Sequence, residues 1–204
     1  MRPRSASVRR LLASASAGVA VVWATAAPPR AETRLIDAAR SRVTVRVFKS
    51  GLFSAFADNH VINAHIASGT ISEDAPLAVS LTIRSADLQV LDPNLSSDRR
   101  ADVQARMLGP EVLDVSKFPE VSFASTTIAP GGPDRWQVTG RLTMHGHVGT
   151  ITFPVVRTAD TYRGDVALKQ RDFGIEPIKI AGGAVKVKDE IKVEFEIAIA
   201  LRND

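Results

Sequence analysis

Four histidines are the side chains of this sequence best suited to hold a metal ion or to move a proton: His60, His65, His145 and His147. His145 and His147 are two residues apart, so on a regular strand both imidazoles lie on one face, where they could chelate a metal with one further ligand, although Gly146 between them can break the strand. Asp58 and His60 are the candidates for that ligand. The chain has no HExxH motif and no Cys/His spacing typical of zinc sites. We therefore favour structural histidines, and no metal or other cofactor is predicted.

Two further groupings contain the residue types of hydrolases. Ser54, Asp58 and His60 place triad side chains in one short segment, but nothing in the sequence resembles a nucleophile elbow or an oxyanion hole. Asp189 and Glu190 are adjacent carboxylates, yet neighbouring residues of a strand point to opposite faces. No catalytic residue is predicted, and we expect that the protein is not an enzyme.

Aromatic side chains are few and could contact an apolar ligand. Phe53 and Phe56 lie in a loop of small residues, an unusual place for aromatic rings unless they plug an opening or touch a ligand. Four more rings either pack the core or line a cavity: Phe118, Phe123, Phe153 and Phe173.

The elements that must position these residues are mainly strands. Apolar and polar residues alternate with a period of two in many segments, which indicates strands with one buried face. Turn sequences such as 130–133 (PGGP) and 181–183 (AGG) separate them. The predicted strands are 43–47, 60–71, 77–84, 121–128, 136–144, 150–157, 162–169 and 191–201.

One helix interrupts this pattern, near residues 97–108. Ser96 and Ser97 are suitable N-caps, Asp98 lies in the first turn, and Gly109-Pro110 ends the helix. Its apolar stripe is modest, so we expect it to lie across one end of a barrel.

Closure of such a sheet into a barrel removes its edges. We therefore predict an all-β fold, an antiparallel closed (lipocalin-like) β-barrel of about eight strands. A barrel of this size either fills its lumen with side chains or holds one small ligand. The inward positions of the clearest strands are apolar or glycine, so any cavity is unsuited to a charged substrate.

Residues 1–31 are typical of a secretory signal peptide. Residues 2–10 are basic and 11–27 are uncharged and apolar, with Ala24-Thr25-Ala26 as a cleavage site. Seventeen uncharged residues, many of them small, are short for a membrane span. We expect cleavage, a mature domain over 32–204 without an integral membrane span, and a periplasmic or secreted location.

The leader also carries the excess positive charge. Five of the 26 basic residues are arginines within 1–31, which leaves 21 basic against 22 acidic residues in the remainder. Nucleic acids and anionic membrane surfaces need a clustered basic footprint. Nucleic acid is therefore not an expected partner.

Several motifs, in order along the chain, resemble the YceI-like family. Residues 113–125 contain LDV and FPEVSF followed by Ser125, 140–146 read GRLTMHG, 172–175 read DFGI, and 185–190 end in VKDE. Residues 35–37 (LID) and 51–53 (GLF) fit the family's opening elements. The resemblance covers about residues 33–201, and the order and spacing of the motifs make it fairly specific.

The resemblance implies an exported lipocalin-like barrel whose elongated apolar lumen holds a polyisoprenoid or a similar long-chain lipid. This chain departs from the family's pattern at Asp58, where members with a comparable loop often carry His, and at His147-Val148-Gly149, which intervenes before Thr150. Both differences fall where polar contacts to a ligand head group are expected.

The leading hypothesis is thus non-catalytic binding of a polyisoprenoid, an isoprenoid quinone or another apolar lipid, for storage, transport or stress protection. The expected ligand-binding residues are Phe53, Phe56, His60, Phe123, Trp136, Met144, His145, Phe153 and Phe173. Two alternatives stay open: a metal- or quinone-associated redox protein using His60, His145 and His147, and a filled barrel acting in protein interaction. A homodimer is compatible with the sequence.

Overall fold

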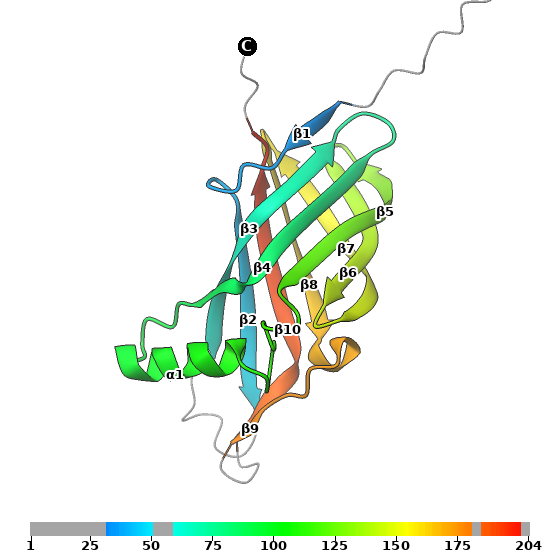
Figure 1. The fold of residues 1–204 in the computed structure, drawn as a ribbon. Coiled ribbons are helices and arrows are strands. Elements are labelled where there is room, and N and C mark those ends of the chain that lie inside the picture. The colour runs from blue at the N-terminus through cyan, green and yellow to red at the C-terminus, as the bar shows by residue number, and fades with distance from the viewer. Residues whose placement is uncertain (1–31, 51–58, 181–184, 201–204) are drawn as a thin grey trace, which may run out of the picture. The chain divides into compact units, whose positions relative to one another are not determined.

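A computed structural model, which describes residues 32–50, 59–180 and 185–200, has ten strands: the eight predicted segments each form one, and two short strands are additional (Figure 1). The strands are β1 (Thr33–Leu35), β2 (Arg42–Ser50), β3 (His60–Ser72), β4 (Ala78–Val90), β5 (Glu120–Gly132), β6 (Arg135–Met144), β7 (His147–Thr158), β8 (Thr161–Lys169), β9 (Lys179–Ile180) and β10 (Val185–Ala198). The helices are α1 (Ser97–Leu108) and the short 3₁₀ helix η2 (Gln170–Phe173).

Eight strands close into a barrel. They pair in the order β3-β2-β10-β8-β7-β6-β5-β4, and β4 pairs back with β3. Every pairing is antiparallel. β1 extends the wall beside the last residues of β3, and β9 adds to β10. This confirms the predicted closed antiparallel barrel of about eight strands.

The helix α1 lies at one end of the barrel, where β4 ends (Figure 1). The Ser96 side chain caps it by accepting a hydrogen bond from the backbone N–H of Arg99, at 3.5 Å. Gln104 fastens the helix to β4: its Oε1 accepts from the N–H of Val90 and its Nε2 donates to the carbonyl of Leu88, both at 2.7 Å. Met107 is buried and faces the barrel interior. The predicted helix is confirmed, and it partly covers this end of the lumen.

The strand breaks at Gly146, between the two histidines, in the turn that joins β6 to β7. His145 and Gly146 have positive φ angles of 50° and 75°, the conformation of a two-residue hairpin turn. Met144 pairs with His147 across this turn, so His145 lies outside the ladder. His145 and His147 therefore do not share the face of one regular strand, although their rings still stack with centroids 6.4 Å apart.

Candidate functional site

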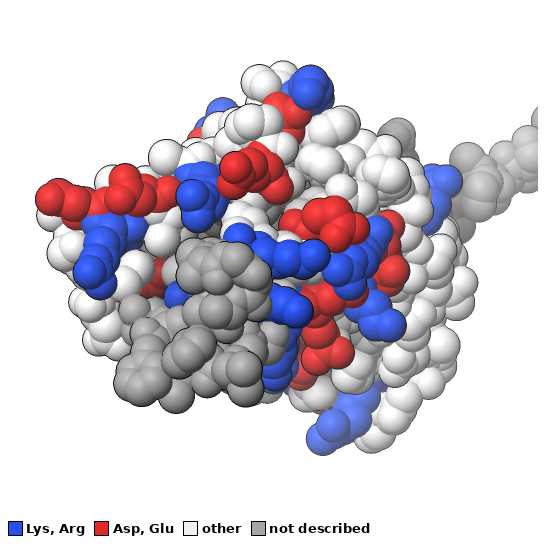
Figure 2. All heavy atoms as spheres, turned by 90° about the horizontal axis from the view of Figure 1, so that it is seen from below, with Lys and Arg blue, Asp and Glu red and all other residues white. Residues whose placement is uncertain are grey.

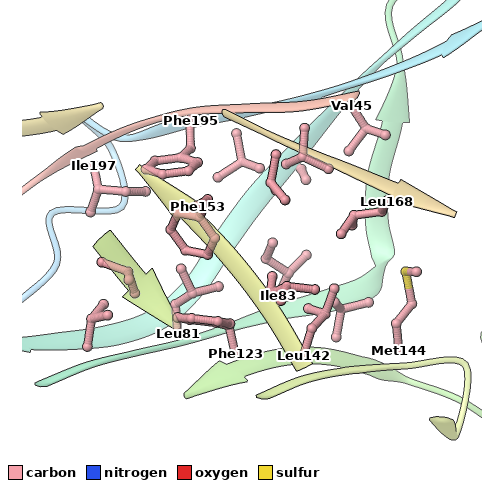
Figure 3. A pocket seen from close by; sticks show the side chains of 18 of the residues that line it. Val45, Leu81, Ile83, Phe123, Leu142, Met144, Phe153, Leu168, Phe195 and Ile197 are labelled. Atoms are coloured by element: carbon pink, nitrogen blue, oxygen red, sulfur yellow. The ribbon is translucent and has the colours of Figure 1, made fainter. Parts of the chain in front are cut away.

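The period-two alternation turns one row of side chains from each barrel strand into a common lumen. There they border a cavity of about 310 Å³ (Figure 3). All eight barrel strands contribute, and 32 of the 37 lining residues are apolar. The polar exceptions are Ser72, Glu73, Arg157, Tyr162 and Gln170. The cavity falls within the size range of small-molecule sites, so the barrel is hollow rather than filled with side chains.

Three phenylalanine rings form a column across the cavity (Figure 3). The ring centroids of Phe123 and Phe153 are 5.5 Å apart, and those of Phe153 and Phe195 are 5.4 Å apart. Phe123 lies against Gly140 and Phe195 against Gly164, where a Cβ atom would approach the ring to 2.3 Å and 2.6 Å. The two glycines thus create the space that lets these rings lie close to the wall.

The two ends of the cavity differ. At the end near α1, here called the α1 end, it is lined by Met107, Val112, Leu113 and Ile175 together with Gln170. The buried amide of Gln170 donates to the carbonyl of Lys188 at 2.8 Å. The lining of the described α1 end therefore contains one polar side chain, a buried neutral amide that donates one of its two N–H groups to the backbone.

The opposite end, here called the Glu73 end, holds a polar cluster. Glu73 Oε1 accepts from the Tyr162 hydroxyl at 2.5 Å and its Oε2 accepts from Arg34 Nη1 at 2.9 Å. Arg157 forms an ion pair with the same carboxylate, with Nη1 3.1 Å from Oε1. Glu73 directly follows β3, whereas Tyr162 lies on β8, and β2 and β10 separate these strands in the sheet. These contacts consequently bridge the end of the barrel.

The cluster shifts the titration of its members. Burial opposes the charge on Glu73, but the hydrogen bonds from Tyr162 and Arg34, with the positive charges of Arg157 and Arg34, outweigh it and lower the pKa of the carboxyl. Burial and the neighbouring carboxylate raise the pKa of the Tyr162 phenol. Glu73 is therefore an anion, and Tyr162 a neutral donor, at neutral pH.

The lowered pKa of Glu73 predicts how the free energy of unfolding depends on pH. Because the folded pKa of Glu73 is below its unfolded value of about 4.3, its contribution is fully present above that pH and is lost as the pH falls through the folded pKa. We expect Glu73→Gln to be less stable than the wild type at pH 7 and the difference to shrink below about pH 4. Urea denaturation from neutral to acid pH measures it. A difference that does not change with pH would contradict the assignment.

The structure divides the predicted ligand-binding residues into three groups. Phe123, Trp136, Met144 and Phe153 line the cavity. His60, His145 and Phe173 are not among its lining residues: Phe173 is 2% exposed and packs in the wall, where its ring comes within 2.9 Å of a Cβ built at Gly149. Phe53 and Phe56 lie outside the described residues.

The histidines have local partners. His60 Nδ1 is 2.5 Å from Asp92 Oδ2, and His145 Nδ1 is 3.2 Å from the carbonyl of Phe173, with its ring tilted against Phe118. Within residues 32–50, 59–180 and 185–200, no group of three or more His, Asp or Glu side chains is placed to hold a metal ion.

Asp92 anchors the start of β3 to the segment that leads into α1. Asp92 is 4% exposed, and its Oδ1 accepts from the backbone N–H of Val61 at 2.8 Å while Oδ2 contacts His60. We expect Asp92→Ala to lower the free energy of unfolding by about 2 kcal/mol, because it leaves a buried N–H and an imidazole without their acceptor. Urea denaturation measures this. Asp87→Ala, which removes an exposed ion pair with Arg84, is the control and should change stability by less than about 0.5 kcal/mol.

Sequence reasoning missed the Glu73 end. The same alternation that turns Phe153 and Val155 inward also turns Arg157 inward, and Tyr162 shares its register with Val166 and Leu168. The inward register of these strands was therefore a usable signal for both residues. Glu73 follows the end of a strand and carries no such signal.

The outer surface at the α1 end carries both positive and negative side chains. In Figure 2, which views this end, basic and acidic side chains are interspersed over the described atoms. A shallow groove there combines Arg171, Lys179, Lys186 and Lys188 with Asp189 and Glu190. In the described part of the chain, no helix has the length and apolar content needed to cross a membrane.

Comparisons with known proteins identify relatives over most of the chain. The family model described as the YceI-like domain matches residues 35–199. A UPF0312 protein of Vibrio cholerae is 28% identical over 141 residues, which are 62% of this chain and 68% of that protein. A UPF0312 protein of Pseudomonas putida is 37% identical over 76 residues, 32% of this chain, and the match spans 40% of that relative's length.

Solved structures share the fold. BcnA of Burkholderia cenocepacia has a TM-score of 0.64 at 21% identity, covering 81% of this chain and 99% of BcnA. A polyisoprenoid binding domain from Saccharophagus degradans, implicated in plant cell wall breakdown, has a TM-score of 0.58 at 16% identity, covering 84% of this chain and 100% of that domain. At these identities the likeness shows the fold alone.

Proposed function

The chain belongs to the YceI-like family, as its motifs suggested, and from that premise we propose that it binds a long-chain apolar ligand in the barrel lumen without acting on it chemically. The ligand class is a polyisoprenoid, an isoprenoid quinone or a similar lipid, held for storage, transport or stress protection. The polyisoprenoid binding domain from Saccharophagus degradans, which has this fold, supports that class.

The observation that carries the proposal is the continuous apolar lining of the lumen. It extends from Trp136 near the Glu73 end, past the phenylalanine column, to Met107 and Leu113 at the α1 end. Such a surface offers no partners for a polar substrate, but it can contact a hydrocarbon along its whole length. The three rings of the column supply large contact areas.

The energetics favour long ligands. Each buried methylene contributes about 0.8 kcal/mol, whereas association costs about 4–15 kcal/mol in lost freedom of movement. A short hydrocarbon barely offsets that cost, while a chain that fills the lumen exceeds it. Tight binding therefore needs few polar contacts, which agrees with the scarcity of polar residues in the wall.

Chain length is the variable that tests the proposal. Among geraniol, farnesol and geranylgeraniol, which differ successively by one isoprene unit, we expect each added unit to tighten binding by at least about tenfold until the lumen is full. Equilibrium dialysis measures the dissociation constants. Equal affinities along the series, or no binding of geranylgeraniol, would contradict the proposal.

We also propose that residues 1–31 are removed on export and that residues 32–204 act in the periplasm or outside the cell. The basic and then apolar composition of the leader supports this. N-terminal sequencing of the protein recovered from the periplasm or the medium tests it. A chain that retains Met1 in either compartment, or one found only in the cytoplasm, would contradict it.

A further inference from the structure

The lumen is polar at the Glu73 end and apolar along most of its length. Among the described lining residues, Ser72, Glu73, Arg157 and Tyr162 belong to that end, and Gln170 is the one polar side chain elsewhere. The Gln170 side chain is buried and one N–H of its amide donates to the backbone of Lys188, so the α1 end offers a ligand a single neutral amide, whereas the Glu73 end offers a guanidinium. A ligand with one polar end therefore meets two different environments.

The hydrogen bonds of the cluster leave capacity for a further partner. Arg157 donates through Nε to the carbonyl of Ala159 at 2.7 Å, and its Nη1 forms an ion pair with Glu73. A guanidinium has five N–H groups in a planar fork, so others remain for another acceptor. The Tyr162 hydroxyl donates its only hydrogen to Glu73, and its oxygen can still accept a hydrogen bond.

The cluster is also held in position before any ligand arrives. Glu73 is fixed by hydrogen bonds from β1 and β8 and by an ion pair with Arg157 on β7, and the Arg157 guanidinium lies over the Tyr162 ring, 5.5 Å from its centroid. The Arg157 side chain is 35% exposed and borders the cavity, so it faces both the lumen and its surroundings. Donors fixed in this way cost little further ordering when they bind a ligand.

We propose that Arg157 binds the polar end of the ligand, an oxygen that accepts hydrogen bonds such as that of a carboxylate, a phosphate or a carbonyl group, beside the Tyr162 ring over which the guanidinium lies. The ligand then lies with this end at Glu73 and its hydrocarbon tail towards α1. This orientation rests on the proposed function, because it requires that the lumen binds a long-chain ligand.

Trp136 makes the orientation measurable. It lines the cavity, and its ring centroid lies 5.9 Å from that of Tyr162, so it reports on the Glu73 end. The chain has two tryptophans, and the other is Trp23. In the full chain carrying Trp23→Phe, the fluorescence of Trp136 can be followed alone.

The probes are two doxyl-stearic acids, one with the nitroxide near the carboxylate and one with it near the methyl end. Nitroxides quench tryptophan at short range. We expect the probe labelled near the carboxylate to quench Trp136 at least about threefold more than the other, since the polar end sits beside Tyr162. Equal quenching, or stronger quenching by the probe labelled at the methyl end, would overturn the orientation.

The electron spin resonance spectra of the same probes separate this inference from the proposed function. A bound nitroxide is immobilised whichever way the chain lies. Immobilised spectra with the wrong quenching order overturn the orientation alone. Freely tumbling spectra for both probes at saturating protein overturn the binding function and the orientation together.

Substitutions test the residues themselves. We expect Arg157→Gln to weaken the binding of stearic acid and octadecyl phosphate by about tenfold or more and that of octadecane by less than about twofold. Arg163→Gln is the matched control, because Arg163 is one residue beyond Tyr162, points outward and pairs with Glu196.

The affinities of the wild type for stearic acid and octadecyl phosphate also identify the preferred head group. Whichever of the carboxylate and the phosphate binds the wild type more tightly is the better match to the site. An Arg157→Gln variant that folds as the wild type does, and binds all three probes with unchanged affinity, would exclude Arg157 from the site.

Discussion

Replacing Val166 by Glu is expected to weaken the binding of geranylgeraniol by at least about 100-fold at pH 7. Val166 lies on β8, lines the cavity and pairs with Val193 across to β10. A carboxylate at this position would be ionised at pH 7 and would hold water in the lumen. The ligand would then have to bind beside that water or displace it from the carboxylate. Both outcomes cost far more than the lost contact of one valine side chain.

The loss of affinity in the Val166→Glu variant should depend on pH. Burial raises the pKa of a carboxyl group, so the introduced group becomes neutral on mild acidification. We expect part of the lost affinity to return as the pH is lowered towards about 5, whereas the wild type changes little. The affinities can be measured by equilibrium dialysis at each pH.

The matched control is Ala167→Glu. Ala167 is the next residue on β8, is exposed on the outer face and pairs with Lys192. The same side chain one position away should leave binding within about twofold of the wild type. If both variants lose binding equally, the lumen is not where the ligand lies.

Gly164→Ala is expected to lower the free energy of unfolding by about 2–3 kcal/mol. A Cβ at this position would lie 2.4 Å from the carbonyl oxygen of Pro154 and 2.6 Å from the ring of Phe195. The carbonyl belongs to the paired strand β7, so the backbone cannot move aside without disturbing the barrel wall. Phe195 would shift out of the phenylalanine column, so we expect weaker ligand binding as well.

Gly131→Ala is the control for this substitution. Its Cβ would meet atoms of Arg135 at 3.6 Å or more, an ordinary contact, so we expect a change within about 0.5 kcal/mol. Urea denaturation of both variants measures the difference. Equal stabilities for the two variants would show that the close approach at Gly164 does not constrain the wall.

The fold was largely predictable because its determinants are local. The alternation in 191–201 placed Ile191, Val193 and Phe195 on one face, and the structure has these side chains in the lumen. Ser96 and Gly109 marked the ends of α1 through capping, which depends on neighbouring residues alone.

The site was less predictable because its contacts cross the barrel. Tyr162 and Glu73 are 89 residues apart, and no pattern in either segment says that their strands face the same opening. The hollow lumen was equally out of reach, since inward Val, Leu and Phe side chains occur in filled barrels too. Whether a cavity remains depends on how Phe123, Phe153 and Phe195 stack against their glycines.

The histidine pair shows that spacing alone does not place side chains. Two residues of separation allow His145 and His147 to share a strand face, but His145 adopts a positive φ in a tight turn. The Gly146 beside it, with φ of 75°, is the residue that such a turn favours.

Native mass spectrometry of the protein purified from its own export compartment, followed by solvent extraction, tests the central claim most directly. We predict a protein mass increased by one bound molecule, which extracts as a long-chain isoprenoid, a quinone or an acyl lipid. A bare polypeptide mass that stays unchanged after incubation with geranylgeraniol would contradict a lipid-binding lumen.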